Sequence, residues 1–423
     1  MTGFFSTGAQ KASSRYCLPK SLSIVIGYVC LQVSPVQAEL ITEQEAIKQA
    51  LSRPMMAIAE KSDIEAAQQT VNEVSLWPNP MVSIERTQVS GHEGRNTELT
   101  YQIAQTFDIS GHRRLEKKAA QQHLMSVKAL QQDQRQAIIL EVRQIFLELL
   151  YQQQLQEIYQ KWQAHLNQAQ QTIQKLVKAG EVSGYDSRRL QQELLTASTQ
   201  SVQIQAEIVL LQHRLAGLTF AQAADELTVT GRLLPLNLPD LKELQQKLSN
   251  RSDLAAMDAQ INALSHQAEA AGLNKIPDIS LGIGQKRISS PTGSSDGISL
   301  SLAMPLPVFN QGRTRQLKFL SEADSLRAKR DLRYQQANSV LIGKWQQLEH
   351  LAKAAIALRE NAIGNAERLS TIAQAAYHAG EVGVLELLDA YRGELSTAQN
   401  VITLEYQASL ARVTLDSLVG VTP

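Results

Sequence analysis

Two stretches of the chain show a helical spacing of apolar residues over an unusual length. Residues 113–179 contain no glycine or proline, and apolar positions return mostly every three or four residues, which is typical of a helix that packs in a coiled coil. At about 1.5 Å per residue, such a helix would be roughly 100 Å long. Residues 313–379 have the same spacing, with a stripe that includes Leu341, Leu348, Ala355, Leu369 and Ile372. We predict two long helices, at about 113–179 and about 313–379.

Four shorter segments alternate between apolar and polar residues, which indicates strands with one apolar face. The alternation is clearest at 98–109, where Leu99, Tyr101 and Ile103 share a face, and at 297–308. Segments 81–89 and 279–288 precede them, and the intervening loops are rich in glycine and serine, as hairpin tips are. We predict two β-hairpins, with strands within about 79–110 and about 277–309.

These elements occur twice in the same order, which indicates an internal duplication. The sequence WPNPMVSI at 77–84 matches NKIPDISL at 274–281 around Pro80 and Pro277. The tetrapeptide Ala-Gly-Glu-Val ends both long helices, at 179–182 and at 379–382. We predict a first repeat over 39–235 and a second repeat over 236–423.

The first 38 residues differ from both repeats. They carry three basic and no acidic side chains, then an apolar run at 22–33, and they end in Val36-Gln37-Ala38, the pattern of a secretory signal peptide. The apolar run is shorter than the roughly 18 residues that a membrane-spanning helix needs. Both cysteines lie in this segment, so we expect no thiolate ligand and no cysteine nucleophile in the mature chain.

Charge and composition narrow the class of protein further. The chain has 41 basic and 41 acidic side chains, and loss of the signal peptide would leave a small acidic excess, which disfavours a nucleic-acid partner. Aromatic residues make up only 5% of the chain, which suits long amphipathic helices better than a broad globular core. No Ser-His-Asp spacing, phosphate loop or metal cluster indicates catalysis. We therefore expect no enzyme activity and no cofactor.

Four strands with one apolar face cannot shield their own edges in a bilayer, where unpaired backbone groups are not tolerated. Three copies would supply twelve strands, an even number within the range of outer-membrane barrels, and would set their long helices side by side as a tube. The predicted fold is therefore mainly α with a small β part. Its unit is a duplicated helix-strand-strand-long helix-helix arrangement, and the expected assembly is a homotrimer.

In its duplication, its order of elements and its two glycine-containing tips, the mature chain resembles the TolC family of outer-membrane efflux channels. The segments PLPVFNQGR (305–313) and FDISGHRR (107–114), where a strand gives way to a long helix, are similar to those of the heavy-metal cation-efflux (CzcC-type) branch. The resemblance implies a trimeric outer-membrane β-barrel, with four strands per chain, that continues into a periplasmic α-helical barrel.

The resemblance also implies a function and partners. The chain would be a passive exit duct for cations such as cobalt, zinc or cadmium in the outer membrane of a Gram-negative cell. It would work with a periplasmic membrane-fusion adaptor and an inner-membrane RND pump, and would contact outer-membrane lipid. The sequence specifies neither the cation nor the individual pump and adaptor.

Two alternatives stay open at this point. A TolC-type channel can instead export drugs or, in type I secretion, proteins, and only the strand-to-helix joints distinguish these cargoes here. A periplasmic adaptor is also helical, but it has one helical hairpin beside a lipoyl-like β domain, whereas this chain has two hairpins in repeat order.

The two Ala-Gly-Glu-Val segments are expected at the periplasmic tips of the helices. Gly180 and Gly380 can adopt the left-handed conformation that ends a helix, so a helix cap explains either copy alone. Their equivalent positions in the two repeats, together with the resemblance, imply adaptor docking at eight residues: Ala179, Gly180, Glu181, Val182, Ala379, Gly380, Glu381 and Val382.

The resemblance places a gate beside these tips. It implies acidic side chains at the constricted end of the duct, namely Asp186, Glu386 and Asp389, and a latch between Tyr377 and Asp186. Acids that face a lumen attract cations and repel anions, although solvated positions near a helix start explain the same residues. The arginine that supports the latch in the family corresponds to Val382, so any latch should be weaker or built differently.

The eight histidines do not indicate a dedicated metal site. No two of them lie three or four residues apart, and no cysteine accompanies them in the mature chain, so the ligand spacings of common metal sites are missing. We expect the histidines to be surface or packing residues.

Overall fold

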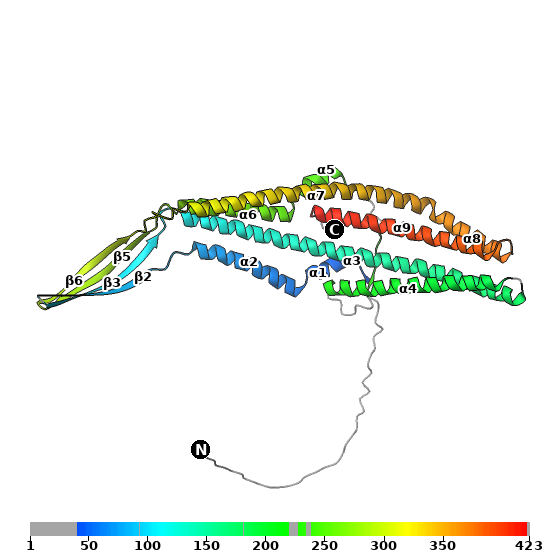
Figure 1. Cartoon of the computed structure of the whole chain (residues 1–423), viewed down its shortest axis with the longest axis horizontal. Coiled ribbons are helices and arrows are strands. Elements are labelled where there is room, and N and C mark those ends of the chain that lie inside the picture. The colour runs from blue at the N-terminus through cyan, green and yellow to red at the C-terminus, as the bar shows by residue number, and fades with distance from the viewer. Residues whose placement is uncertain (1–39, 93, 181, 220–226, 234–237, 421–423) are drawn as a thin grey trace, which may run out of the picture. The chain divides into compact units, whose positions relative to one another are not determined.

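The computed structural model of the chain describes residues 40–92, 94–180, 182–219, 227–233 and 238–420, and the predicted signal peptide lies outside them. The helices are α1 (Glu43–Leu51), α2 (Pro54–Ser75), α3 (His112–Ala179), α4 (Gly184–Thr219), α5 (Leu241–Leu248), α6 (Ser252–Leu273), α7 (Arg313–Asn361), α8 (Ile363–His378) and α9 (Val384–Leu418). The strands are β1 (Leu40–Ile41), β2 (Met81–Gly91), β3 (Gly94–Phe107), β4 (Thr228–Val229), β5 (Ile279–Ser290) and β6 (Gly293–Ala303). The elements follow the predicted order in both repeats (Figure 1).

The longest element is α3, whose 68 residues correspond to about 100 Å of helix. Its N-terminal part packs against α2 and α6, and its C-terminal part packs against α4 and α9. Along the predicted stripe, Val142, Leu149, Leu166 and Ile173 are each 0% exposed. None of the helices in the described residues combines the length and the apolar character that a membrane span requires.

The second long helix is interrupted, unlike α3. Helix α7 ends at Asn361 and α8 begins at Ile363, with Ala362 between them at φ −102° and ψ −39°. The predicted stripe is buried up to Ala355, but Leu369 and Ile372 are 62% and 64% exposed. The single helix predicted over 313–379 is therefore two helices, and the change at Ala362 turns a different face of α8 toward the core.

Strands β2, β3, β5 and β6 form one antiparallel sheet in that order, so the two predicted hairpins lie side by side (Figure 1). One row across the sheet pairs Val82, Ile103, Ile283 and Leu300, and these side chains are between 48% and 77% exposed. Within the described residues, this sheet has an uncovered apolar face and two edge strands, β2 and β6, without a further partner.

The end of β6 differs from the prediction. The strand stops at Ala303, whereas the alternation of apolar residues extends to Val308. Pro305 and Pro307 have no N–H for the ladder, and the Val308 N–H donates to the Leu306 carbonyl at 2.9 Å in a local turn. The predicted strand was therefore too long at this end, because proline overrides an apolar pattern.

Both long helices begin after a glycine in the left-handed conformation, at φ 77° for Gly111 and φ 79° for Gly312. A Cβ atom on Gly312 would lie 1.9 Å from the carbonyl oxygen of Ala271, whereas a Cβ atom on Gly111 would meet nothing within 4 Å. The start of α7 thus passes much closer to the end of α6 than a side chain would allow.

Gly312→Ala should therefore destabilise the protein more than Gly111→Ala. Both variants place alanine in the left-handed region, which costs about 1 to 2 kcal/mol, but only Gly312→Ala also forces α6 and α7 apart. We expect an additional loss of about 2 kcal/mol, measured from the thermal unfolding midpoints of the detergent-purified proteins. Equal midpoints would contradict this difference between the two joints.

Candidate functional site

The first tip connects α3 to α4. Gly180 adopts the left-handed conformation at φ 78°, and its N–H donates to the carbonyl groups of Leu176 and Val177. Ser183 Oγ donates to Asp186 Oδ2 at 2.8 Å, and the Asp186 N–H donates back to Ser183 Oγ at 3.4 Å. Gly180 therefore ends α3, while Asp186 takes part in the cap of α4. Glu181 lies outside the described residues.

The second tip connects α8 to α9 through the same kind of turn. Gly380 has φ 74°, its N–H donates to the Tyr377 carbonyl at 3.1 Å, and the Glu381 N–H donates to the Ala376 carbonyl at 2.9 Å. This bonding pattern satisfies the last carbonyls of a helix. A Cβ atom on Gly180 or Gly380 would meet nothing within 4 Å, so both turns leave free space around the glycine.

The remaining tip residues differ in exposure. Ala179, Ala379 and Glu381 are exposed, whereas Val382 is partly buried and packs against the core cluster. Val182 is also partly buried. Each tip therefore exposes its alanine and glycine and partly buries its valine.

Tyr377 lies in the core near the first tip and is 6% exposed. Burial raises the pKa of its hydroxyl, and the charge of the nearby Asp186 carboxylate raises that pKa further. The hydroxyl has no hydrogen-bond partner among the described residues. The fold thus brings the two members of the predicted latch near each other, but in this conformation Asp186 bonds to Ser183.

Glu386 and Asp389 lie three residues apart on α9, so they share one helix face, and both are exposed. With Leu369 and Ile372 they line a groove of about 960 Å³ that runs along α7, α8 and α9. Neither acid forms an ion pair with another described residue. Their charges therefore face open space in the isolated chain.

Ion pairs tie the two helical hairpins to each other. Lys161 Nζ on α3 lies 2.9 Å from Glu394 Oε1 on α9 and 3.1 Å from Glu367 Oε1 on α8. Arg392 on α9 pairs with Glu193 on α4. Sequence reasoning missed these links, because their members come from different repeats and lie about 200 residues apart.

The ion pair between Lys161 and Glu394 depends on the ionisation of the Glu394 carboxyl group. Burial alone would raise the pKa of Glu394, but hydrogen bonds from Ser370 and Lys161 and the charge of Lys161 outweigh burial and lower the pKa below its usual value. A depressed folded-state pKa contributes stability above the unfolded value of about 4.3, and this contribution is lost as the pH falls through the folded value. The link should therefore persist at neutral and mildly acidic pH.

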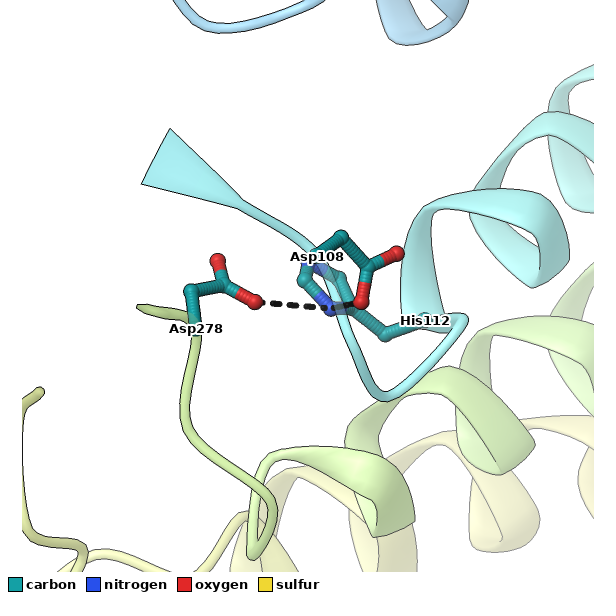
Figure 2. A group of neighbouring side chains, drawn as sticks. All are labelled: Asp108, His112 and Asp278. Atoms are coloured by element: carbon teal, nitrogen blue, oxygen red, sulfur yellow. Dashed lines mark ion pairs between the residues drawn. The ribbon is translucent and has the colours of Figure 1, made fainter. Parts of the chain in front are cut away.

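A further group of titratable side chains lies where β3 gives way to α3 (Figure 2). His112 Nδ1 is 3.2 Å from Asp108 Oδ1 and 3.8 Å from Asp278 Oδ1, and Asp278 belongs to the segment between α6 and β5. The spacing of histidines and cysteines along the sequence does not reveal this group, because its other two members are aspartates. The available signal was the pair Asp108 and His112, which are four residues apart.

Comparisons with known proteins agree with this architecture. Residues 244–421 match the family described as outer membrane efflux protein. No curated protein sequence matches the chain. Among solved structures, the outer-membrane channel OprN is 20% identical, with a TM-score of 0.72 and coverage of 90% of each chain.

Two further structures have the same fold. VceC, an outer membrane protein from the bacterial pathogen Vibrio cholerae, is 17% identical, with a TM-score of 0.73 over 89% of this chain and 96% of that chain. CusC, a protein that undergoes transmembrane channel formation, is 16% identical, with a TM-score of 0.71 over 90% of this chain and 92% of that chain. The mainly helical fold with a small sheet and the TolC-like resemblance are thus confirmed. The cation-efflux branch stays a prediction.

Because the Tyr377 hydroxyl is buried without a partner, Tyr377→Phe should leave the free energy of unfolding unchanged or raise it by up to about 1 kcal/mol. Tyr377→Ala empties the space of a buried ring and should lower the free energy of unfolding by about 3 to 5 kcal/mol. Thermal unfolding of the purified variants measures both effects. A clearly destabilised Tyr377→Phe would mean that the hydroxyl makes a bond in solution that this conformation lacks.

Proposed function

We propose that this chain, TolC-like in its fold and in the sequence of residues 244–421, is the outer-membrane exit duct of a three-part efflux system. The observation that carries the proposal is the uncovered apolar face of the β2-β3-β5-β6 sheet. Such a face suits lipid only if the sheet edges pair with other copies. A homotrimer would supply twelve strands, enough for an outer-membrane barrel with a water-filled lumen.

The helices would continue this duct into the periplasm. Helix α3 follows β3 across the short joint at 108–111, and α7 follows β6 across a longer segment, 304–312. Their partners α4 and α9 pack alongside them, so three copies would form the wall of a helical tube. The duct itself catalyses no reaction in this proposal, and the inner-membrane RND pump supplies the energy for export.

The two tips are the proposed docking sites for the periplasmic membrane-fusion adaptor. Gly180 and Gly380 end their helices in the same conformation and have free space around them, so a trimer would offer six equivalent turns to an adaptor hairpin. Adaptor binding would favour the open state of the tips by binding that state more tightly. Separation of the hairpins would have to break links such as Lys161 to Glu394.

Heavy-metal cations are the proposed cargo. Glu386 and Asp389 have exposed carboxylates without ion-pair partners among the described residues, and threefold symmetry would turn each into a ring of three acids. Such rings concentrate cations at a constriction. The segment PLPVFNQGR, similar to the cation-efflux branch, supports the same cargo.

Lipophilic drugs are the second candidate cargo. The groove that contains Glu386 and Asp389 also presents Leu369 and Ile372, which are more than half exposed. Exposed apolar side chains of this kind suit apolar compounds or another protein surface. The acidic side chains of the groove therefore favour cations and its apolar side chains favour drugs, and an export assay distinguishes the two cargoes.

Replacing both tip glycines, as in Gly180→Val together with Gly380→Val, should abolish efflux without preventing trimer assembly. A β-branched residue is strained in the left-handed conformation, so the turns should change shape and lose the adaptor. Resistance of a complemented deletion strain measures efflux, and a heat-modifiable trimer in the outer-membrane fraction measures assembly.

Gly343→Val is the matched control for the docking test. Gly343 lies within α7 without a positive φ, and a Cβ atom there also meets nothing within 4 Å. This variant should keep full resistance. If the double tip variant also kept full resistance at normal expression, the docking proposal would be rejected.

The cargo is tested with a deletion strain grown on zinc, cobalt, cadmium, nickel, copper and silver salts and on lipophilic drugs. We expect sensitivity to one or more of the cations, restored by the wild-type chain. Complementation with Glu386→Gln and Asp389→Asn together should restore less cation resistance, because the proposed rings lose their charge. Sensitivity to drugs alone would replace the metal assignment with the second candidate.

A further inference from the structure

The two strand-to-helix joints share one structural device. Asp108 Oδ1 accepts a hydrogen bond from the Gly111 N–H at 2.8 Å in the first joint, and Asn310 Oδ1 accepts from the Gly312 N–H at 3.1 Å in the second. Both side chains therefore support the glycine turn that precedes a long helix. This role explains why a side-chain acceptor precedes the glycine in both repeats, three residues before Gly111 and two residues before Gly312.

The internal repeat does not explain His112 and Asp278, the two side chains that lie beside Asp108. When the repeats are aligned on their glycine turns and prolines, His112 corresponds to Arg313 and Asp278 corresponds to Met81. Only the first joint thus combines an imidazole with two carboxylates, and the three side chains converge there (Figure 2). A turn that needed only its cap would not require these residues.

One oxygen of this group lacks a partner. Asp278 Oδ1 is buried, although one-third of the Asp278 side chain is exposed, and it accepts no hydrogen bond from any described residue. It lies 3.8 Å from His112 Nδ1, which is too far for a hydrogen bond. A buried carboxylate oxygen without a donor is costly and calls for an explanation, and a bound cation supplies one.

We propose that Asp108 Oδ1, His112 Nδ1 and Asp278 Oδ1 bind a divalent transition-metal cation of the zinc type, with water completing its coordination. One imidazole nitrogen and two carboxylate oxygens form a donor set that zinc accepts. With metal-ligand bonds of about 2.0 to 2.2 Å, ligand atoms of a tetrahedral site lie about 3.3 Å apart. The observed separations from His112 Nδ1 are 3.2 and 3.8 Å, and all three atoms lie within 4.8 Å of one another.

The surroundings favour an ionised Asp108, but the Ser110 hydroxyl competes with a cation for two of the proposed ligand atoms. The backbone N–H of Gly111 donates to Asp108 Oδ1 at 2.8 Å and that of Arg113 donates to Asp108 Oδ2 at 3.1 Å, and such bonds favour an ionised carboxylate. Ser110 Oγ lies 2.9 Å from both Asp108 Oδ1 and His112 Nδ1, so it must rotate away when a cation enters. The positive end of α3 also opposes a cation, so the charges of both carboxylates are needed.

A cation at this position would connect the two repeats. Asp108 and His112 come from the β3-α3 joint, and Asp278 immediately precedes β5, next to the pairing of Phe107 with Ile279. The ion would hold these segments together where the sheet meets the helices. The site does not depend on the cargo of the duct, and it departs from the expectation, based on histidine spacing, that the chain has no metal site.

Titration of Zn²⁺ into the chelator-treated, detergent-purified full-length protein tests the proposal by isothermal titration calorimetry. We expect one tight ion per chain. Asp278→Asn removes a charged ligand without removing a hydrogen bond of the described structure, and should weaken the affinity at least about tenfold. His112→Asn should act in the same direction.

His123→Asn is the control for adventitious histidine binding. His123 is an exposed histidine on the same helix, and its Nδ1 lies 3.2 Å from Gln260 Oε1 rather than beside a carboxylate. This variant should bind Zn²⁺ like the wild type. Zn²⁺ should also raise the unfolding midpoint of the wild type and of His123→Asn, since a ligand that binds only the folded state stabilises it, but not that of Asp278→Asn.

Two results would overturn the site: no Zn²⁺ binding by the wild type, or the same affinity in Asp278→Asn. An equal loss in His123→Asn and Asp278→Asn would also overturn it, because the binding would then be nonspecific. All measurements use the purified protein, so their outcome does not depend on the outcome of the export assays.

Discussion

The unpaired edges of the β2-β3-β5-β6 sheet are the constraint on which the rest of the structure depends. The apolar row of Val82, Ile103, Ile283 and Leu300 has no cover within the described residues. Exposure of this face to lipid is favourable only if the backbone groups of β2 and β6 are paired, since each unpaired group in lipid costs several kcal/mol. In the proposed trimer, closure of the sheet also sets where three sets of long helices meet.

The two helical hairpins differ in how completely their apolar side chains are buried. Helix α3 is continuous and buries a stripe from Val142 to Ile173 against α4 and α9. The second hairpin is interrupted at Ala362, and beyond it Leu369 and Ile372 remain exposed beside Glu386 and Asp389. The second hairpin therefore carries the uncovered surface of the tip region, whereas the first supplies most of its core.

Internal duplication separates structural positions from chemical ones within a single chain. The glycine turns, the tip glycines and a side-chain acceptor shortly before each joint glycine (Asp108 and Asn310) occur in both repeats, because both copies must end and begin helices in the same way. His112 and Asp278 have no counterpart of the same type. Residues that differ between the two repeats are not required by the structure that the repeats share, so they are the first candidates for a function beyond folding.

The spacing of apolar residues indicated the long helices and the four long strands and located α3 to within one residue, and the repeated Ala-Gly-Glu-Val segment indicated both tips. Local packing and hydrogen bonding impose these patterns, so they can be read along the chain. The prolines after Ala303 mark the end of β6 in the sequence, but the apolar alternation continues past them and made the predicted strand too long. The tertiary structure alone decided the interruption at Ala362, the contact of Lys161 with Glu394, and the meeting of His112 with Asp278. The last two contacts join residues of different repeats, and only the packing of helices and the register of β3 with β5 bring them together.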